Sequence, residues 1–120
     1  MMKKKHINLE YLEEISGGDN YMILEMIGIF NSEVPEYLSM MNEYIDRGDW
    51  DALGKLAHKV KASASIMGLS ELTTELNHLE VCAKEKQSPD ICLSHARNIK
   101  KQFTYAIEEL KSISKNLKKK

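Results

Sequence analysis

The few glycines and prolines of the chain separate stretches of helical length, and this spacing is the strongest constraint on its fold. The 120 residues include only six glycines and two prolines. Between them apolar residues recur every three or four positions, as on one face of an α-helix, and no segment alternates with the period of two that a half-buried strand needs. The sequence therefore predicts an all-α protein without a sheet.

We expect one short helix followed by four long ones, joined by tight turns. The expected helices cover residues 7–16, 19–47 with a break near Pro35, 49–67, 70–86 and 89–117. Asp19, Asp49 and Ser70 are residue types that cap helix N-termini, and Ser88-Pro89 is a further start signal. The four long helices are expected to form an antiparallel, up-down four-helix bundle, with the short N-terminal helix packed across them.

Length and composition favour one compact domain. At 42% hydrophobic and 29% charged residues, the chain fits a single globular domain with one core. We expect this domain to span residues 1–120, with flexible, lysine-rich ends at 1–6 and 115–120. Cys82 and Cys92 are too few for a disulfide framework, so we expect reduced thiols in a cytoplasmic protein. A monomer is the simplest expectation for a small bundle.

The charge distribution argues against nucleic acids and membranes as partners. Seven of the 17 basic residues are lysines in the two ends, so the body of the chain is strongly acidic, unlike a nucleic-acid-binding domain. Short lysine runs at chain ends are usually solvated tails. No apolar run comes near the roughly 20 residues that cross a bilayer, and the basic start is followed by a segment too acidic for a signal peptide.

The helix expected over residues 49–67 carries a histidine opposite its core face. That core face consists of Leu53, Leu56, Val60, Ala64 and Met67. At about 100° per residue His58 points the other way, with Gly54 one turn before it and Ala62 one turn after it. Because a glycine inside a helix costs about 1 kcal/mol relative to alanine, Gly54 suggests close approach by the backbone of another protein.

An exposed imidazole at this position is suited to attack phosphorus. Histidine is substantially neutral at pH 7, so one ring nitrogen keeps a free lone pair. Lys55 and Lys61 flank His58, and Lys61 can balance the charge of a phosphoryl group. A lone histidine would be interpreted as an incidental surface residue, but its small and basic neighbours favour a phosphoryl acceptor.

The residues after His58 extend this pattern into a longer motif. Residues 57–69 read AHKVKASASIMGL. This run resembles the H-x-x-K-G-S signature of histidine-containing phosphotransfer (HPt) domains of two-component phosphorelays, with Ala62 where glycine is usual. Three further motifs resemble family features in the same order: Gly17-Gly18-Asp19, Gly48-Asp49-Trp50 and Leu79-Glu80. The likeness covers nearly the whole chain.

The resemblance implies roles for individual residues. His58 would accept the phosphoryl group through Nε2, Lys61 would be its charge partner, and Ser65 would add a hydroxyl beside it. Glu80 stands where family members place a glutamate or glutamine near the active imidazole. A carboxylate that accepts the Nδ1–H would fix the tautomer and raise the basicity of Nε2. The alternative for Glu80 is an ordinary exposed charge on a helix.

The resemblance also implies the partners and the chemistry. The chain would take a phosphoryl group from the aspartyl phosphate of one receiver domain and pass it to another, the receivers belonging to response regulators or a hybrid sensor histidine kinase. It would have no kinase activity of its own. We expect no cofactor, because Mg²⁺ would be held by the acidic pocket of the receiver.

Residues 21–30 are apolar almost all round, which leaves two interpretations. The surplus apolar residues, with Met22 and Met26 among them, could form a docking patch for the receiver, since methionine suits an adaptable surface. In that case Gly54, Lys55 and Ala62 would complete the partner-binding surface. Alternatively, this part of the helix is simply buried on two sides.

Three rival functions can be weighed against phosphotransfer. A zinc site built from His78, Cys82, Cys92 and His95 would have suitable ligands but no known compact zinc spacing, and we assign no metal site. A non-phosphorylated adaptor for response regulators is the main alternative, although both His58 and Lys61 are retained. An enzyme with its own turnover is disfavoured, because the sequence has no glycine-rich phosphate loop or nucleotide-binding motif.

Overall fold

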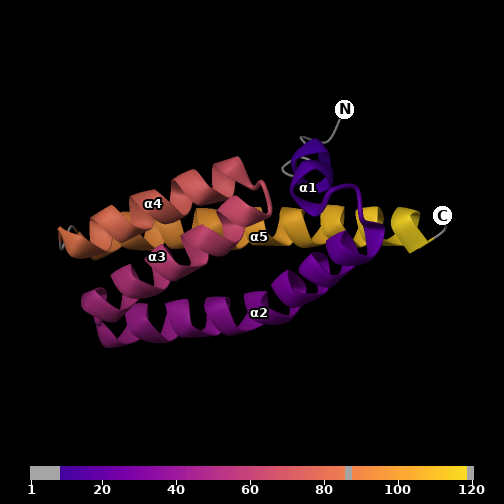
Figure 1. Cartoon of the computed structure of the whole chain (residues 1–120). Helices are drawn as coiled ribbons and strands as arrows, with labels where there is room; N and C mark the ends of the chain where they lie inside the picture. The colour runs from indigo at the N-terminus through magenta and orange to yellow at the C-terminus, as the bar shows by residue number, and fades with distance from the viewer. Residues whose placement is uncertain (1–8, 86–87, 119–120) are drawn as a thin grey trace, which may run out of the picture.

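The computed structural model describes residues 9–85 and 88–118, and these residues form five α-helices without a strand (Figure 1). The helices are α1 (Leu9–Ser16), α2 (Asn20–Arg47), α3 (Trp50–Ile66), α4 (Ser70–Lys84) and α5 (Pro89–Lys118). The predicted all-α class is confirmed. The expected first residue of the first helix, Ile7, and the expected end of the fourth at residue 86 lie outside the described residues.

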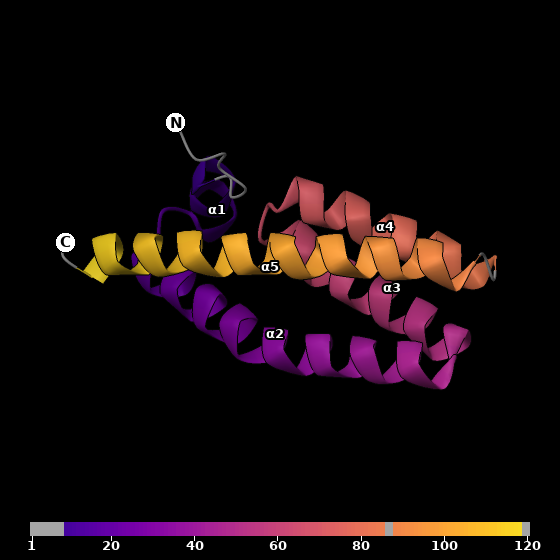
Figure 2. The ribbon, with the colours of Figure 1, turned by 180° about the vertical axis from the view of Figure 1, so that it is seen from behind.

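Helices α2 to α5 run alternately in opposite directions, as Figures 1 and 2 show from two sides. Each packs against two others, in the cyclic order α2, α3, α4, α5 and back to α2. The short α1 packs against α2 and lies across one end of the bundle. This arrangement is the expected four-helix bundle with an additional N-terminal helix.

Two aspartates start the long helices as the sequence predicts. The Asp19 carboxylate accepts hydrogen bonds from the backbone N–H groups of Tyr21 (2.9 Å) and Met22 (3.3 Å). The Asp49 carboxylate accepts one from Ala52 (3.1 Å). Both satisfy N–H groups that have no partner inside the first helical turn. Between α2 and α3, Gly48 has φ of 67°, a left-handed conformation that glycine adopts without a steric penalty.

The predicted cap at Ser70 is wrong. Leu69 is the N-cap of α4, and it makes no side-chain capping bond. Ser70 is the first residue inside the helix. The preceding Gly68, with φ of 72°, turns the chain so tightly that Leu69 is buried in the core at 1% exposure. Burial of Leu69 in the core, and not a side-chain cap, therefore accompanies the start of α4.

The predicted break near Pro35 is also wrong, because α2 continues through this residue. A proline inside a helix removes one backbone hydrogen bond and costs about 3 kcal/mol. Buried side chains on both sides of Pro35 hold the helix against the core: Ile23, Ile27, Phe30, Val34, Tyr37 and Met41. Each contributes roughly 1.5–3 kcal/mol, so their burial outweighs the lost bond. The helix is bowed rather than interrupted (Figure 1).

The core combines apolar residues from all five helices. Every residue of the predicted core face of α3 is buried. The α5 face is buried along its middle at Ala96, Ile99, Phe103, Ala106 and Leu110, and Phe103 packs on Phe30 with ring centroids 5.9 Å apart. Helix α5 continues to Lys118, one residue beyond the expected end at residue 117. Residues 1–6 and 119–120 lie outside the described part of the chain.

Candidate functional site

His58 projects from the middle of α3 into solvent. Its side chain is 70% exposed, whereas Ala57 before it and Val60 after it are buried in the core. The helical period that buries those neighbours turns His58 outward. The predicted exposure of this imidazole is confirmed.

The Glu80 carboxylate on α4 lies beside His58 and is the centre of a group of charged side chains. Glu80 Oε2 is 2.9 Å from His58 Nδ1, and Oε1 accepts a hydrogen bond of 2.8 Å from Lys61 Nζ. Lys84 Nζ approaches Oε2 to 3.3 Å. The Glu80 side chain is only 7% exposed, so the alternative of an ordinary exposed helix charge is wrong.

These contacts determine the charge of Glu80 and the tautomer of His58. The hydrogen bond from Lys61 outweighs the effect of burial and, with Lys84 and His58, lowers the Glu80 pKa from 4.5 to about 2. Glu80 is therefore a carboxylate at neutral pH, and a carboxylate can only accept hydrogen bonds. Because His58 Nδ1 faces it, Nδ1 carries the ring proton in the neutral imidazole. Nε2 then holds the free lone pair.

Lys61 lies one turn after His58 and is oriented by α4. Its ammonium group donates to Glu80 and also to Asn77 Oδ1 at 3.1 Å, and the side chain is 27% exposed. An ammonium group has three N–H donors, so one remains for an incoming group. Lys61 therefore lies beside the imidazole with spare positive charge.

Three other predicted site residues lie on the outer side of α3. Ser65 is exposed two turns beyond His58, and within the described chain no hydrogen bond joins its hydroxyl to His58, Lys61 or Glu80. Ala62 is exposed one turn beyond His58. Lys55 is also exposed, and its Nζ forms an ion pair with Asp51 Oδ2 at 3.4 Å.

Gly54 does not lie open to a partner, which corrects the reason given for it from the sequence. It is buried at the contact between α3 and α4. A Cβ built on Gly54 would lie 3.6 Å from Ala83 Cβ and 3.9 Å from the Glu80 carbonyl oxygen. Both distances are ordinary van der Waals contacts, so the packing of α3 on α4 leaves room for a methyl group at this position.

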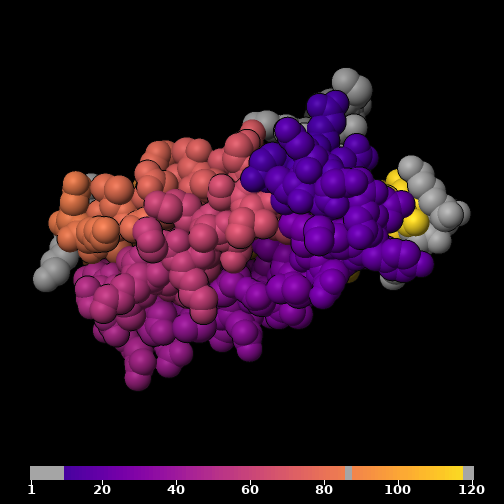
Figure 3. Space-filling view, viewed as in Figure 1, coloured from indigo at the N-terminus to yellow at the C-terminus, as the bar shows by residue number. Residues whose placement is uncertain are grey.

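Some of the apolar side chains in the first turns of α2 are exposed. Ile23, Ile27 and Phe30 are buried, while Met22 is 46% exposed and Met26 is partly buried against the core. Burial on two sides is therefore wrong for this segment. Figure 3 shows that α1 and the start of α2, in indigo, share one face of the molecule with α3 and α4. The start of α2 lies past the C-terminal end of α3 (Figure 1), so the first turns of α2 lie away from the middle of α3 along the bundle.

Two contributors to the site were not singled out from the sequence. Asn77 and Lys84 flank Glu80 on α4, at one turn before and one turn after it, and both contact the charged group. Their helical spacing relative to Glu80 is visible in the sequence. Without the relative placement of α3 and α4, however, that spacing does not show that Asn77 faces Lys61.

The four-residue zinc site weighed from the sequence does not form. Cys82 and Cys92 are buried in the core, and burial, with a smaller contribution from Cys82, raises the Cys92 pKa to about 12. A protonated thiol is a poor metal ligand. His78 and His95 instead come together with Glu75, and among the described residues no cysteine sulfur joins that group.

Comparison with known proteins supplies the family. A family model described as "Hpt domain" matches residues 25–113, which include all of α3 and α4. The chain belongs to the Hpt domain family. Hpt domains carry phosphoryl groups on histidine in two-component phosphorelays, interact with receiver domains and kinases, and are not enzymes by themselves. No curated protein and no solved structure was matched.

The Hpt fold of this chain shows no membrane-spanning segment within the described residues. None of its helices there combines the length and the apolar composition needed to cross a bilayer.

Proposed function

We propose that His58 is the phosphoryl carrier of a phosphorelay, accepting a phosphoryl group from the aspartyl phosphate of one receiver domain and passing it to the aspartate of another. The observation that carries this proposal is the contact of 2.9 Å between Glu80 Oε2 and Nδ1 of an imidazole that is 70% exposed. The buried carboxylate holds one edge of the ring, and Nε2 is the nitrogen left to react.

The transfer step follows from that tautomer. The Nε2 lone pair attacks phosphorus, the P–O bond to the receiver aspartate breaks, and the aspartate leaves as a carboxylate. The imidazole gains positive charge as the N–P bond forms, while its proton stays on Nδ1, hydrogen-bonded to Glu80. The negative carboxylate stabilises this charge. In the reverse direction a second aspartate attacks the same phosphorus and the N–P bond breaks.

Lys61 is the second residue of the mechanism. It keeps Glu80 ionised through the 2.8 Å hydrogen bond, and its remaining N–H donor can reach an oxygen of the transferring phosphoryl group. Charge-assisted hydrogen bonds of this kind are stronger than neutral ones. Lys61 thus stabilises two negative charges beside His58: that of the Glu80 carboxylate and that of the transferring phosphoryl group. Ser65, two turns away, belongs to the surface that a phosphorylated partner would approach.

The partner is a receiver domain bound over the outer side of α3. Ala62 offers little steric hindrance beside His58, Lys55 adds an exposed positive charge, and Met22 adds apolar surface toward the end of the bundle. Met26 contributes only its exposed part. The receiver brings Mg²⁺ in its own acidic pocket, so the chain itself needs no cofactor for this step. We expect the chain to act as a monomer.

The test is phosphotransfer from a phosphorylated receiver domain in the presence of Mg²⁺, followed by intact mass and by the stability of the adduct in acid and alkali. We expect one acid-labile, alkali-stable phosphoryl group on the wild-type chain and none on His58→Gln. His95→Gln, which changes a histidine on α5, is the matched control and should be phosphorylated normally. No adduct with several receivers, despite native helicity, would favour the non-phosphorylated adaptor.

A further inference from the structure

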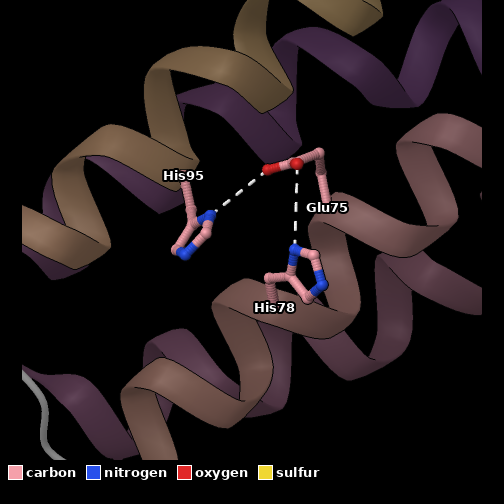
Figure 4. Close-up of side chains that lie close together, drawn as sticks. All are labelled: Glu75, His78 and His95. Carbon is pink, nitrogen blue, oxygen red and sulfur yellow. Dashed lines mark hydrogen bonds and ion pairs between the residues drawn. The ribbon is translucent and has the colours of Figure 1, made fainter.

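A second group of histidine and carboxylate side chains lies between α4 and α5. Glu75 and His78 come from α4, three residues apart, and His95 comes from α5 (Figure 4). Glu75 Oε2 is 3.2 Å from His95 Nδ1, and Oε1 is 3.8 Å from His78 Nδ1. Figure 4 shows both imidazoles turned toward the carboxylate. The group belongs to the α5 side of α4, whereas Glu80 faces α3.

The electrostatic surroundings of Glu75 suit a cation. Among the described residues no lysine or arginine forms an ion pair with Glu75, and both of its oxygens face imidazole nitrogens. Imidazoles bind metals in their neutral form, and in that form the two rings and the carboxylate together would carry a net negative charge and several lone pairs. Imidazole and carboxylate together are ligands that zinc takes in proteins.

We propose that Glu75, His78 and His95 form a binding site for a divalent transition-metal ion, with Zn²⁺ as the best fit. One ligand atom from each residue lies within 4.8 Å of the other two. Bonds of about 2.0–2.2 Å at tetrahedral angles place ligand atoms roughly 3.4 Å apart. The distance from His95 Nδ1 to Glu75 Oε2 is 3.2 Å and that from His78 Nδ1 to Oε1 is 3.8 Å, so each imidazole lies near this separation from one of the two carboxylate oxygens.

Small side-chain rotations are enough to close the site. The ring centroids of His78 and His95 are 5.4 Å apart with an interplanar angle of 53°, so the rings are not stacked face to face. The His78 side chain is 50% exposed and that of His95 is 28% exposed, which leaves room for reorientation. When Nδ1 binds the metal, the ring proton resides on Nε2.

The bound ion would link α4 to α5. Three protein ligands leave a fourth tetrahedral position for water or for a donor atom from another molecule. Because the ion would bind the folded arrangement of the two helices and not the separated side chains, zinc should stabilise the bundle. This site is independent of phosphotransfer, since neither His58 nor Glu80 is a ligand.

The first test is a Zn²⁺ titration of the full chain, without an affinity tag, by isothermal calorimetry. We expect one zinc per wild-type chain, and an apparent dissociation constant at least about tenfold higher in His78→Gln and in His95→Gln. The matched control is His58→Gln, which breaks the other histidine–glutamate pair and should bind zinc like the wild type. Glu75→Gln, which removes the charge but keeps the shape, should also weaken binding.

Thermal unfolding by circular dichroism supplies a second readout. Zinc should raise the Tm of the wild type and of His58→Gln, and should leave the Tm of His95→Gln unchanged. Equal helicity of all variants without metal would show that each one folds. Absence of zinc binding in the wild type, or retained stoichiometric binding in both His78→Gln and His95→Gln, would overturn the proposal.

Discussion

The two faces of α4 each hold a carboxylate beside histidine, but the charges around the two carboxylates differ. On the α3 face Glu80 is 7% exposed and contacts one imidazole and two lysines. On the α5 face Glu75 is 19% exposed and contacts two imidazoles, with no lysine or arginine paired to it in the described chain.

In the functions proposed above, this difference distinguishes the nucleophilic histidine on the α3 face from the metal ligands on the α5 face. Around Glu80 the lysines supply fixed positive charge, so the carboxylate stays ionised and one imidazole is left with a free Nε2. Around Glu75 no described lysine or arginine forms an ion pair, and two imidazoles share one carboxylate. The same residue types therefore favour phosphoryl chemistry on one face and cation binding on the other.

The largest expected effect follows from removing the carboxylate on the α3 face of α4, and it is a slower phosphotransfer. We predict that Glu80→Ala slows phosphotransfer to His58 about 10–100-fold, the loss typical when the carboxylate that orients a metal-bound imidazole is removed. Stopped-flow or quench-flow measurement of adduct formation checks this. The control is Glu75→Ala, which removes the carboxylate on the α5 face of α4. This variant should transfer at the wild-type rate. Equal rates in Glu80→Ala and wild type would reject the role of Glu80.

The low Glu80 pKa predicts that part of the free energy of unfolding is lost in acid. Because the folded-state pKa is about 2 against an ordinary 4.5, Glu80 contributes stability above pH 4.5 that is lost as the pH falls from 4.5 toward 2. The full shift corresponds to about 3 kcal/mol, and we expect about 1–2 kcal/mol because the Lys84 side of the group is solvated. Urea unfolding at stepped pH should therefore show a steeper loss for wild type than for Glu80→Gln. Parallel curves would contradict this.

The two lysines should differ in importance. Lys61 donates a 2.8 Å bond and is 27% exposed, whereas Lys84 is 3.3 Å away and 71% exposed. We predict that Lys61→Met lowers the transfer rate about tenfold, the value of one charge-assisted hydrogen bond. Lys84→Met should lower it less than about twofold. A larger loss in Lys84→Met than in Lys61→Met would reverse the assignment of the charge partner.

The smallest effect is expected at Gly54, a residue of α3 that packs against α4. A methyl group there meets Ala83 Cβ at 3.6 Å, an ordinary contact, and alanine is favoured over glycine in a helix by about 1 kcal/mol. Gly54→Ala should therefore stabilise the fold by up to about 1 kcal/mol in urea unfolding and leave phosphotransfer unchanged. A loss of phosphotransfer without a loss of stability would instead indicate that Gly54 belongs to the partner-binding surface.

Most of the fold could be predicted from local sequence. Asp19, Asp49 and Gly48 act within one helical turn, and their effects do not depend on the rest of the molecule. The failures occurred where packing outweighed local preference. Pro35 stays inside α2 because side chains before and after it are buried, and Leu69 replaces Ser70 as the cap because it enters the core.

The candidate site was predicted less completely. The exposed position of His58 follows from the period of α3 alone, and the role given to Glu80 came from family resemblance rather than from spacing. The group at Glu75, His78 and His95 depends on the pairing of α4 with α5. A sequence pattern indicates which face of α4 each residue occupies, but not which residue of α5 lies opposite.

The most direct measurement is the position of phosphorus on the ring, by ³¹P and ¹⁵N NMR of the phosphorylated chain labelled in histidine. Because Glu80 holds the proton on Nδ1, we predict a single phosphohistidine, at His58, with phosphorus bonded to Nε2 and the proton retained on Nδ1. Phosphorus on Nδ1 of His58, or on any other residue, would contradict the central claim.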